Sequence, residues 1–117
     1  MIIVTGASGF IGFYLVNQLF DDGFDVLAVD NSGDKEFKYF RKRGIPFVKL
    51  DITKAEEFKK LPQKGIDTVV NLACLQPANV REEDFDPRNY VSVNIMGMVN
   101  LLEYVRQNKI DRIIHTI

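Results

Sequence analysis

The chain alternates between short, continuously apolar runs and longer segments whose apolar side chains recur at helical spacing. The short runs predict five strands, at residues 2–4, 25–29, 47–50, 67–73 and 112–117. The longer segments predict four helices, at residues 10–22, 35–43, 53–61 and 88–108. Strands that alternate with helices in this way predict a parallel sheet, because a parallel pair of strands needs a long crossover connection.

Turn and capping residues sharpen the predicted ends of these elements. Gly44 stops the second helix, and Pro46 permits only the start of the third strand. Thr53 suits the N-cap of the third helix, with Glu56 and Glu57 in the turn that follows. This third helix is expected to be short, because proline and glycine follow it closely.

Two of the predicted helices carry apolar side chains at regular helical spacing. In the first helix these are Phe10, Ile11, Tyr14, Leu15, Leu19 and Phe20. In the longest helix they are Val91, Ile95, Met98, Val99, Leu102 and Val105. A long polar loop with Pro77 and Pro87 connects the fourth strand to this longest helix.

The whole pattern predicts one doubly wound α/β domain over residues 1–117, with three layers in the order α/β/α. Right-handed crossovers give the expected strand order 3-2-1-4-5. In such a sheet ligands bind beyond the carboxyl ends of the strands, where the order reverses. The expected site therefore lies between the first and fourth strands.

The glycine-spaced turn after the first strand is the candidate phosphate site. Gly6 permits a tight turn, Gly9 leaves room for a pyrophosphate, and Gly12 lets the helix pack closely on the strand. The free N–H groups around Phe10 and Ile11 would face the anion along the helix dipole. A strand, turn and helix without any ligand is the alternative, since turns collect glycine for many reasons.

Asp30 strengthens the case for a dinucleotide. It ends the second strand, 18 positions after Gly12, where an acidic side chain that binds an adenosine ribose is expected roughly 20 residues on. No arginine follows directly to hold a 2′-phosphate, which favours NAD over NADP.

Charge and cysteine content narrow the possible partners and location. The formal net charge is −1, which does not favour nucleic acid or an anionic membrane surface as a partner. The basic cluster at 35–43 is interrupted by aromatic residues and predicts a solvated helix face. A single cysteine, Cys74, fits a reducing cytoplasm, and no apolar run approaches the length of about 20 residues that spans a bilayer. No charged leader precedes the first strand.

Other chemically active side chains have simpler interpretations. Cys74 is expected to be a small buried residue rather than a nucleophile. His115, the single histidine, is expected to be a core or edge residue, and a structural metal site is not expected. The acidic run at 82–84 is interpreted as a solvated loop.

Several motifs resemble the extended short-chain dehydrogenase/reductases, the NAD-dependent epimerase/dehydratase family. The segment 5–12, Thr-Gly-Ala-Ser-Gly-Phe-Ile-Gly, resembles the family's opening, and Asp30-Asn31 resembles its ribose-binding strand end. Asp51-Ile52 resembles its adenine contact, and 71–74, Asn-Leu-Ala-Cys, its small-residue turn. Asp86-Pro87 with Tyr90, Asn94, Gly97 and the run 100–103 resembles its fourth helix.

The resemblance implies a dinucleotide site that draws on most of the chain. The cofactor-binding residues that it and the glycine pattern together predict are Gly6, Ser8, Gly9, Phe10, Ile11, Gly12, Asp30, Asn31, Asp51, Ile52, Leu72, Ala73, Cys74 and Asn94. Asp51 could instead be a routine helix cap, and Asn94 could instead bond to backbone. The family implies sugar nucleotides or related small molecules as substrates, altered through transient oxidation by NAD.

The chain departs from the family at its catalytic pair. Family members carry Tyr-x-x-x-Lys on the helix after the fifth strand, where the tyrosine serves as acid and base. Each tyrosine here is followed four positions later by another residue type, namely Gln18, Arg43, Asn94 or Asn108. The family's catalytic serine or threonine is expected just past the end of the chain, with Thr116 as a weaker candidate.

We therefore expect a portion of such an enzyme without its catalytic region and substrate domain, which holds cofactor weakly and turns nothing over. The alternative is a non-catalytic nucleotide sensor or scaffold with the same fold. A methyltransferase-like glycine loop is disfavoured by the turn at Ala73 and the fourth-helix pattern. Strand five would lie at a sheet edge without a covering helix, which predicts self-association, as a homodimer or larger species.

Overall fold

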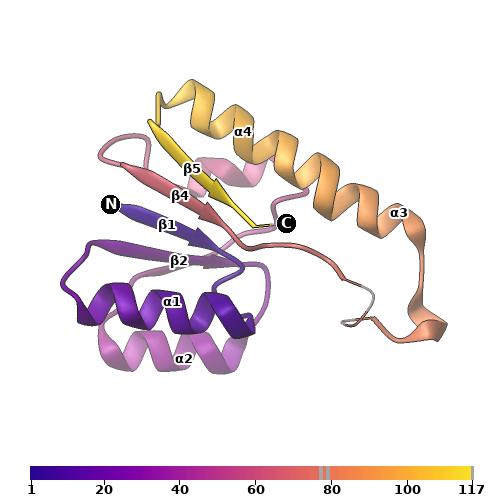
Figure 1. Cartoon of the computed structure of the whole chain (residues 1–117), viewed down its shortest axis with the longest axis horizontal. Helices are drawn as coiled ribbons and strands as arrows, with labels where there is room; N and C mark the ends of the chain where they lie inside the picture. The colour runs from indigo at the N-terminus through magenta and orange to yellow at the C-terminus, as the bar shows by residue number, and fades with distance from the viewer. Residues whose placement is uncertain (77, 79, 117) are drawn as a thin grey trace.

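A computed structural model describes residues 1–76, 78 and 80–116 of the chain. Five parallel strands form one sheet in the order β3-β2-β1-β4-β5, as the sequence predicts (Figure 1). The strands are β1 (Ile2–Thr5), β2 (Val26–Asp30), β3 (Phe47–Lys49), β4 (Thr68–Asn71) and β5 (Arg112–His115). Of the predicted elements, Pro77 in the loop and Ile117 of the fifth strand lie outside the described residues.

Helices cover both faces of the sheet and complete the three predicted layers. On one face lie α1 (Phe10–Asp21) and α2 (Asp34–Arg43). On the other lie the 3₁₀ helix η1 (Ala55–Lys60) and α4 (Gly97–Gln107). The chain reaches α4 through η3 (Glu82–Asp84), α3 (Pro87–Tyr90) and the π-helical η4 (Val91–Met96). Figure 1 shows α3 extending past the sheet, together with the loop before it.

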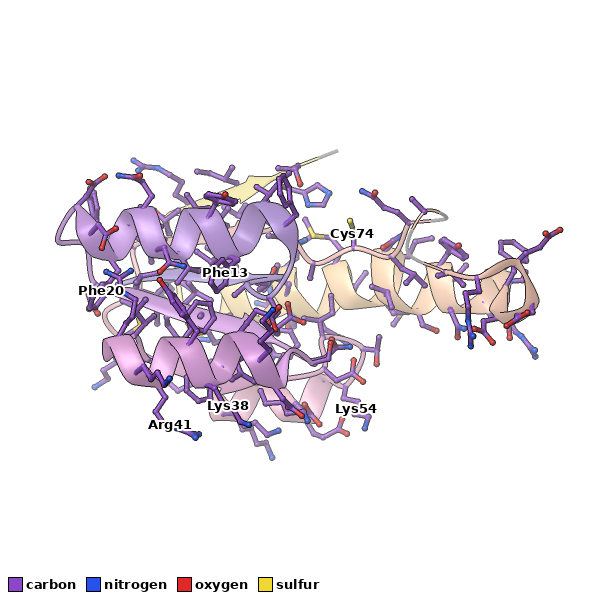
Figure 2. All side chains as sticks on the ribbon, turned by 90° about the horizontal axis from the view of Figure 1, so that it is seen from below. Phe13, Phe20, Lys38, Arg41, Lys54 and Cys74 are labelled. Carbon is purple, nitrogen blue, oxygen red and sulfur yellow. The ribbon has the colours of Figure 1, made fainter. Side chains whose placement is uncertain are left out.

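Successive residues of each strand point to opposite faces, and this alternation divides the core in two. In β1, Ile3 packs toward η1 and α4, whereas Val4 packs toward α1 and α2. On the face of the sheet that α1 and α2 cover, the Phe13 side chain of α1 points toward α2 and stacks on Phe40 at a ring-centroid distance of 5.5 Å (Figure 2). Both faces of the sheet are thus covered by packed apolar side chains, which explains why the strands are continuously apolar.

The outer face of α2 is solvated, as the sequence predicts. Phe37 and Phe40 are buried, while Lys38 and Arg41 are exposed and project from one side of the molecule in Figure 2. Gly44, with φ of 75°, caps the helix in the left-handed region. Among residues 1–76, 78 and 80–116, every helix is too short or too polar to traverse a bilayer.

Only the later part of the predicted apolar stripe of α1 faces the core, where Leu15, Leu19 and Phe20 pack against buried residues. Phe10, Ile11 and Tyr14 are well exposed, whereas Val16 is fully buried. Gly12 packs against the carbonyl of Gly6 and so turns its own side of the helix inward. Close packing of Gly12 on the turn before the helix therefore sets the rotation of its first turns.

In the longest helix, too, only part of the predicted stripe faces the core, where Met98 and Val105 pack against buried residues. Val91, Ile95, Val99 and Leu102 of its predicted stripe are between 43% and 55% exposed. The residues that face the sheet are Gly97, Leu101 and Tyr104. The helix is also not uniform, because residues 91–96 form a π-helical stretch within the predicted α-helix.

The predicted N-cap Thr53 is wrong. The third helix is the 3₁₀ segment η1, whose N-cap is Lys54 and has no side-chain capping bond. The Thr53 hydroxyl instead donates to Asp51 Oδ1 at 2.7 Å, and the Thr53 N–H donates to the same oxygen at 3.0 Å. Asp51 therefore stabilises the turn that contains Thr53, and the short 3₁₀ helix begins after this turn, at Ala55.

Candidate functional site

A cleft of about 430 Å³ opens at the carboxyl ends of the strands, where the strand order reverses. It lies between the glycine turn after β1, the ends of β2 and β3, and the loop after β4. Twelve predicted cofactor-binding residues line it, namely Gly6, Gly9, Phe10, Ile11, Gly12, Asp30, Asn31, Asp51, Ile52, Leu72, Ala73 and Cys74. The weak catalytic candidate Thr116 also lines it. Ser8 and Asn94 do not belong to this lining.

The glycine turn is shaped by contacts that exclude side chains. Gly6 has φ of 70°, and a Cβ there would stand 2.7 Å from the carbonyl carbon of Leu72. A Cβ on Gly12 would overlap the carbonyl of Gly6. Gly9 differs from both, because its Cβ would meet only the Gly6 oxygen, at 3.2 Å. Gly6 and Gly12 are therefore needed for packing, while Gly9 keeps the cleft itself open.

The amino end of α1 offers backbone donors to the cleft. The Gly9 N–H donates to the Gly6 carbonyl at 3.1 Å, and the first helical bond runs from the Phe13 N–H to the Gly9 carbonyl at 2.9 Å. The N–H groups of Phe10 and Ile11 precede that bond and have no intrahelical acceptor. The first turn holds no acidic side chain and Gly9 supplies no capping bond. Such a helix end is suited to binding an anion.

Asp30 lies at the rim of the cleft with its carboxylate held by the backbone. Its Oδ2 accepts the Ser8 N–H at 2.9 Å, and its Oδ1 accepts the Asn31 N–H at 2.7 Å. A carboxylate has about four lone-pair sites, so both oxygens retain capacity for ligand hydroxyls. The bond to Ser8 ties the end of β2 to the glycine turn.

Ser8 faces α2 rather than the cleft. Its hydroxyl is buried and has no hydrogen-bond partner among the described residues. A Cβ on Gly33, which has φ of 109°, would overlap the Ser8 side chain. Ser8 therefore acts at the site through its backbone N–H to Asp30.

Asp51 and Ile52 line the cleft beside the end of β3. The Asp51 N–H donates to the Glu57 carboxylate at 2.7 Å. That bond, together with Lys60, lowers the pKa of Glu57 below its ordinary value. Asp51 uses its Oδ1 within the turn to Thr53, which leaves Oδ2 as the free carboxylate oxygen.

Asn94 positions the loop after β4. Its Oδ1 accepts the Leu75 N–H at 2.8 Å, and its Nδ2 donates to the Leu75 carbonyl at 2.9 Å. The residue belongs to the π-helical segment η4. This is the backbone-bonding alternative for Asn94, and it holds Leu75 against the cleft that Leu75 lines.

Cys74 is exposed and lines the cleft, so the prediction of a buried residue is wrong. Figure 2 shows it on the loop that leaves β4, away from the packed pair α1 and α2. The reason is that β4 ends at Asn71, two residues before the predicted end. Its sulfur lies 3.4 Å from the Gln76 side-chain nitrogen.

Sequence reasoning missed a group of three hydrogen-bonded polar side chains at the carboxyl ends of adjacent strands, of which Thr5 lines the cleft. Thr5, Asn71 and His115 occupy the same register in β1, β4 and β5. Their side chains are hydrogen-bonded in a line from Thr5 through Asn71 to His115. Each is the last residue of its strand, a signal that the predicted strand order could have revealed. The lining residues that were also missed are Thr5, Val29, Leu50, Leu75, Gln76 and Val93.

The remaining titratable groups of the described residues do not gather into a metal site. Among the described residues, no group of three or more His, Cys, Asp or Glu side chains could hold a metal ion. His115 lies on the edge strand and is exposed, which confirms the prediction of a core or edge residue. Tyr90 belongs to α3, and its hydroxyl is buried without a partner among the described residues.

Comparison with known proteins gives a consistent result. A family model, the NAD dependent epimerase/dehydratase family, matches residues 2–116. Protein CapI of Staphylococcus aureus is 33% identical over 123 residues, which cover 97% of this chain and 36% of that protein. The chain thus spans little more than a third of the length of this relative.

Two of the similar solved structures are complexes with a ligand. UDP-glucose 4-epimerase of Thermus thermophilus, a complex with NAD, is 31% identical with a TM-score of 0.76, and the match covers 96% of this chain and 35% of that one. UDP-glucose 4-epimerase of Thermotoga maritima, with UDP-glucose, is 30% identical with a TM-score of 0.76, covering 97% and 36%. The parallel sheet, the glycine turn and the match over nearly the whole chain agree, and the chain belongs to the NAD-dependent epimerase/dehydratase family.

Proposed function

We propose that residues 1–117 form the NAD-binding domain of an epimerase or dehydratase that acts on a sugar nucleotide or a similar small molecule by hydride transfer. The observation that carries the proposal is the juxtaposition of the open glycine turn and Asp30 on one cleft. The NAD and UDP-glucose complexes of related epimerases support the choice of ligand and substrate class.

The residues present fit a dinucleotide. The space beside Gly9, which a side chain would fill, and the unpaired N–H groups of Phe10 and Ile11 would take the diphosphate. Asp30 would accept hydroxyls of the adenosine ribose, and Asp51 with Ile52 would bind the adenine. When bound, NAD supplies the acceptor and donor for hydride. The chain's own residues orient the dinucleotide and keep the cleft floor closed beneath it.

We propose NAD rather than NADP as the cofactor. Both oxygens of Asp30 are fixed by backbone N–H groups, so this anionic side chain cannot easily swing away from a ligand. A 2′-phosphate at the ribose would meet that negative charge at short range. Asn31, which follows, carries no compensating positive charge.

The chain by itself is proposed to bind without turnover. None of its four tyrosines is followed four positions later by lysine, and Thr116 alone stands on the cleft as a candidate hydroxyl at the end of β5. Acid–base chemistry on a sugar hydroxyl then requires groups from outside these 117 residues. We place the protein in the cytoplasm, where the lone Cys74 would stay reduced.

Self-association is part of the proposal. β5 is an edge strand whose residues are mostly exposed, including Ile114 at 48%. An unpaired strand edge with apolar side chains favours pairing with a second copy. Light scattering should therefore report a dimer or larger species, and a clean monomer would contradict this part.

Calorimetric titration of the folded chain with NAD and ADP-ribose tests the proposed function. We expect both to bind, with ADP-ribose retaining most of the affinity because the described contacts gather at the adenosine end. Absence of binding by either compound at millimolar concentration would overturn the proposal.

Cys74 offers an independent reporter of the same site, because it is the single cysteine and lines the cleft. Its alkylation by iodoacetamide should slow when NAD is present. Free nicotinamide, which lacks the diphosphate and adenosine, serves as the matched control and should leave the rate unchanged. Equal rates with and without saturating NAD would argue against occupation of this cleft.

A further inference from the structure

The row formed by Thr5, Asn71 and His115 closes the carboxyl ends of three adjacent strands. Asn71 is 2% exposed, and its amide lies between the two other side chains. The Thr5 hydroxyl donates to Asn71 Oδ1 at 2.5 Å, and Asn71 Nδ2 lies 3.1 Å from His115 Nδ1. Met98 of α4 adds a contact from above, with its sulfur 3.4 Å from Asn71 Nδ2.

The hydrogen-bond network decides which way the Asn71 amide points. The Ala73 N–H donates to Thr5 Oγ1 at 3.3 Å, so the Thr5 hydroxyl proton is free to donate to Asn71. With the amide reversed, that buried proton would have no acceptor, and the amide oxygen would face the Met98 sulfur, which has no proton. The orientation with Nδ2 toward Met98 and His115 satisfies every group.

This orientation sets the hydrogen-bonding role of the imidazole. Asn71 Nδ2 is a donor, so His115 Nδ1 must accept. The ring proton of this tautomer lies on Nε2, because an N–H at Nδ1 would oppose the Asn71 N–H and break the bond.

The same row holds the floor of the cleft. Thr5 precedes Gly6, and Gly6 packs directly on the Leu72–Ala73 peptide. The Ala73 N–H to Thr5 bond joins the loop after β4 to the glycine turn. Releasing Asn71 from His115 removes one support of Thr5 and thereby of Ala73.

We propose that His115 is a positioning residue of the cleft: its Nδ1 acceptor holds Asn71, and through Asn71 and Thr5 it holds the Ala73 segment against the glycine turn. The identity of the ligand rests on the proposed function, but the coupling between His115 and Ala73 does not. Loss of that acceptor releases the support and weakens binding in the cleft.

The hydrogen bond to the His115 ring comes from Asn71 of β4, whose Nδ2 also lies near the Met98 sulfur of α4. Within the described residues, no Asp, Glu, Lys or Arg side chain forms an ion pair or hydrogen bond with His115. His115 is the single histidine of the sequence, so the imidazole nitrogen resonances of this protein report one site.

Nitrogen NMR of the ligand-free chain tests the coupling directly. We expect the Nε2–H tautomer of His115, because Nδ1 accepts from Asn71. His115→Ala removes that acceptor, so its Ala73 amide resonance should shift, whereas His115→Gln keeps an acceptor for Asn71 and should leave the Ala73 resonance close to its original position. An Nδ1–H tautomer, or Ala73 shifts of equal size in the two variants, would overturn the proposal.

Titration with NAD then measures the consequence. Affinity should fall roughly fivefold in His115→Ala, the factor expected for one lost hydrogen bond. His115→Gln should retain the affinity of the unmodified chain, and equal losses in the two variants would contradict the role of His115. If NAD does not bind to the unmodified chain while the Ala73 resonance still shifts in His115→Ala alone, the proposed function fails and the positioning role stands.

Discussion

The backbone N–H of Ser8 donates to the Asp30 carboxylate over 2.9 Å, and this one bond joins the turns that follow β1 and β2. The two strands are adjacent and parallel, so their carboxyl ends meet at the same edge of the sheet. Asp30 thus has two tasks, to stabilise the glycine turn and to present negative charge to the cleft. The first prediction tests both tasks with one substitution.

Asp30→Asn removes the charge and, because its Nδ2 cannot accept, also leaves one of the backbone N–H groups of Ser8 and Asn31 without its acceptor. We expect NAD affinity to fall about tenfold, because a charge-assisted hydrogen bond is replaced by a neutral one. The preference for NAD over NADP should narrow, since the repulsion of a 2′-phosphate is lost. Calorimetric titration with both dinucleotides measures this.

Asp34→Asn is the matched control for that change. Asp34 begins α2, is exposed and does not line the cleft, so the net charge changes equally. Its substitution should leave both affinities within about twofold of the original. A similar loss in both variants would show that overall charge, rather than Asp30, governs binding.

Gly9 and Gly12 should respond differently to an added side chain. Gly9 has ordinary extended backbone, but a Cβ there would stand 3.2 Å from the Gly6 carbonyl oxygen, which would have to shift slightly. Gly9→Val should therefore lower the free energy of unfolding by about 1 kcal/mol and abolish NAD binding. Gly12→Ala should cost on the order of 3 kcal/mol, because its Cβ would overlap the Gly6 carbonyl. Urea denaturation and titration distinguish the two; tight NAD binding by Gly9→Val would refute the assignment of the diphosphate site.

Gly97 lets α4 approach the turn after β3. A Cβ there would stand 2.6 Å from Ile52 Cδ1, and Asn100 donates to the Ile52 carbonyl at 2.8 Å from the same helix. Gly97→Ala should therefore lower the free energy of unfolding by about 1–2 kcal/mol. In an Ile52→Ala background the added methyl should cost much less, because the clashing atoms are gone. Additive losses in the double variant would exclude this contact as the cause.

Tyr104 should make stability depend on alkaline pH. It is 4% exposed, and burial raises its pKa to about 12, while its hydroxyl donates to the Pro62 carbonyl. In the unfolded chain a tyrosine titrates near pH 10. The stabilisation is fully present below about pH 10 and is lost as the pH rises toward 12, because the unfolded state gives up its proton first.

The expected decrease in the free energy of unfolding from Tyr104 is about 2 kcal/mol between pH 10 and 12. Urea denaturation at several pH values measures it. Tyr104→Phe removes the titrating group, so the difference between the two proteins isolates this residue from other alkaline titrations. Parallel pH profiles for the two proteins would show that Tyr104 does not contribute.

Local sequence was sufficient for the elements and for most of the candidate site. The glycine turn, Asp30 and Asp51 lie at strand ends, and strand ends can be located from apolar runs and turn residues alone. Once the strand order 3-2-1-4-5 is expected, these ends must meet on one cleft. Of the twelve predicted residues that line it, the glycine turn and Asp30 follow from this reasoning, whereas Asn31, Asp51, Ile52 and residues 72–74 were predicted from the family resemblance.

The predictions that were wrong concern the rotation of helices about their axes and the length of β4. Phe10 and Tyr14 form a regular stripe with the core-facing periodicity, yet Gly12 against Gly6 turns them to solvent. Cys74 moved from an expected buried position to an exposed one because β4 ends at Asn71. Neither the exposure of Phe10 and Tyr14 nor that of Cys74 can be predicted from the spacing of apolar residues along the chain.

The amino-acid sequence by itself determined the alternation of strands and helices, the order of the strands and the chemistry of the glycine turn, because each follows from neighbouring residues and their turn preferences. Only the tertiary structure decided which helix faces are buried and which distant side chains meet, as Thr5, Asn71 and His115 do across three strands. The meeting of these three side chains depends on packing between segments 44 or more residues apart, where the register of β4 and β5 sets the outcome.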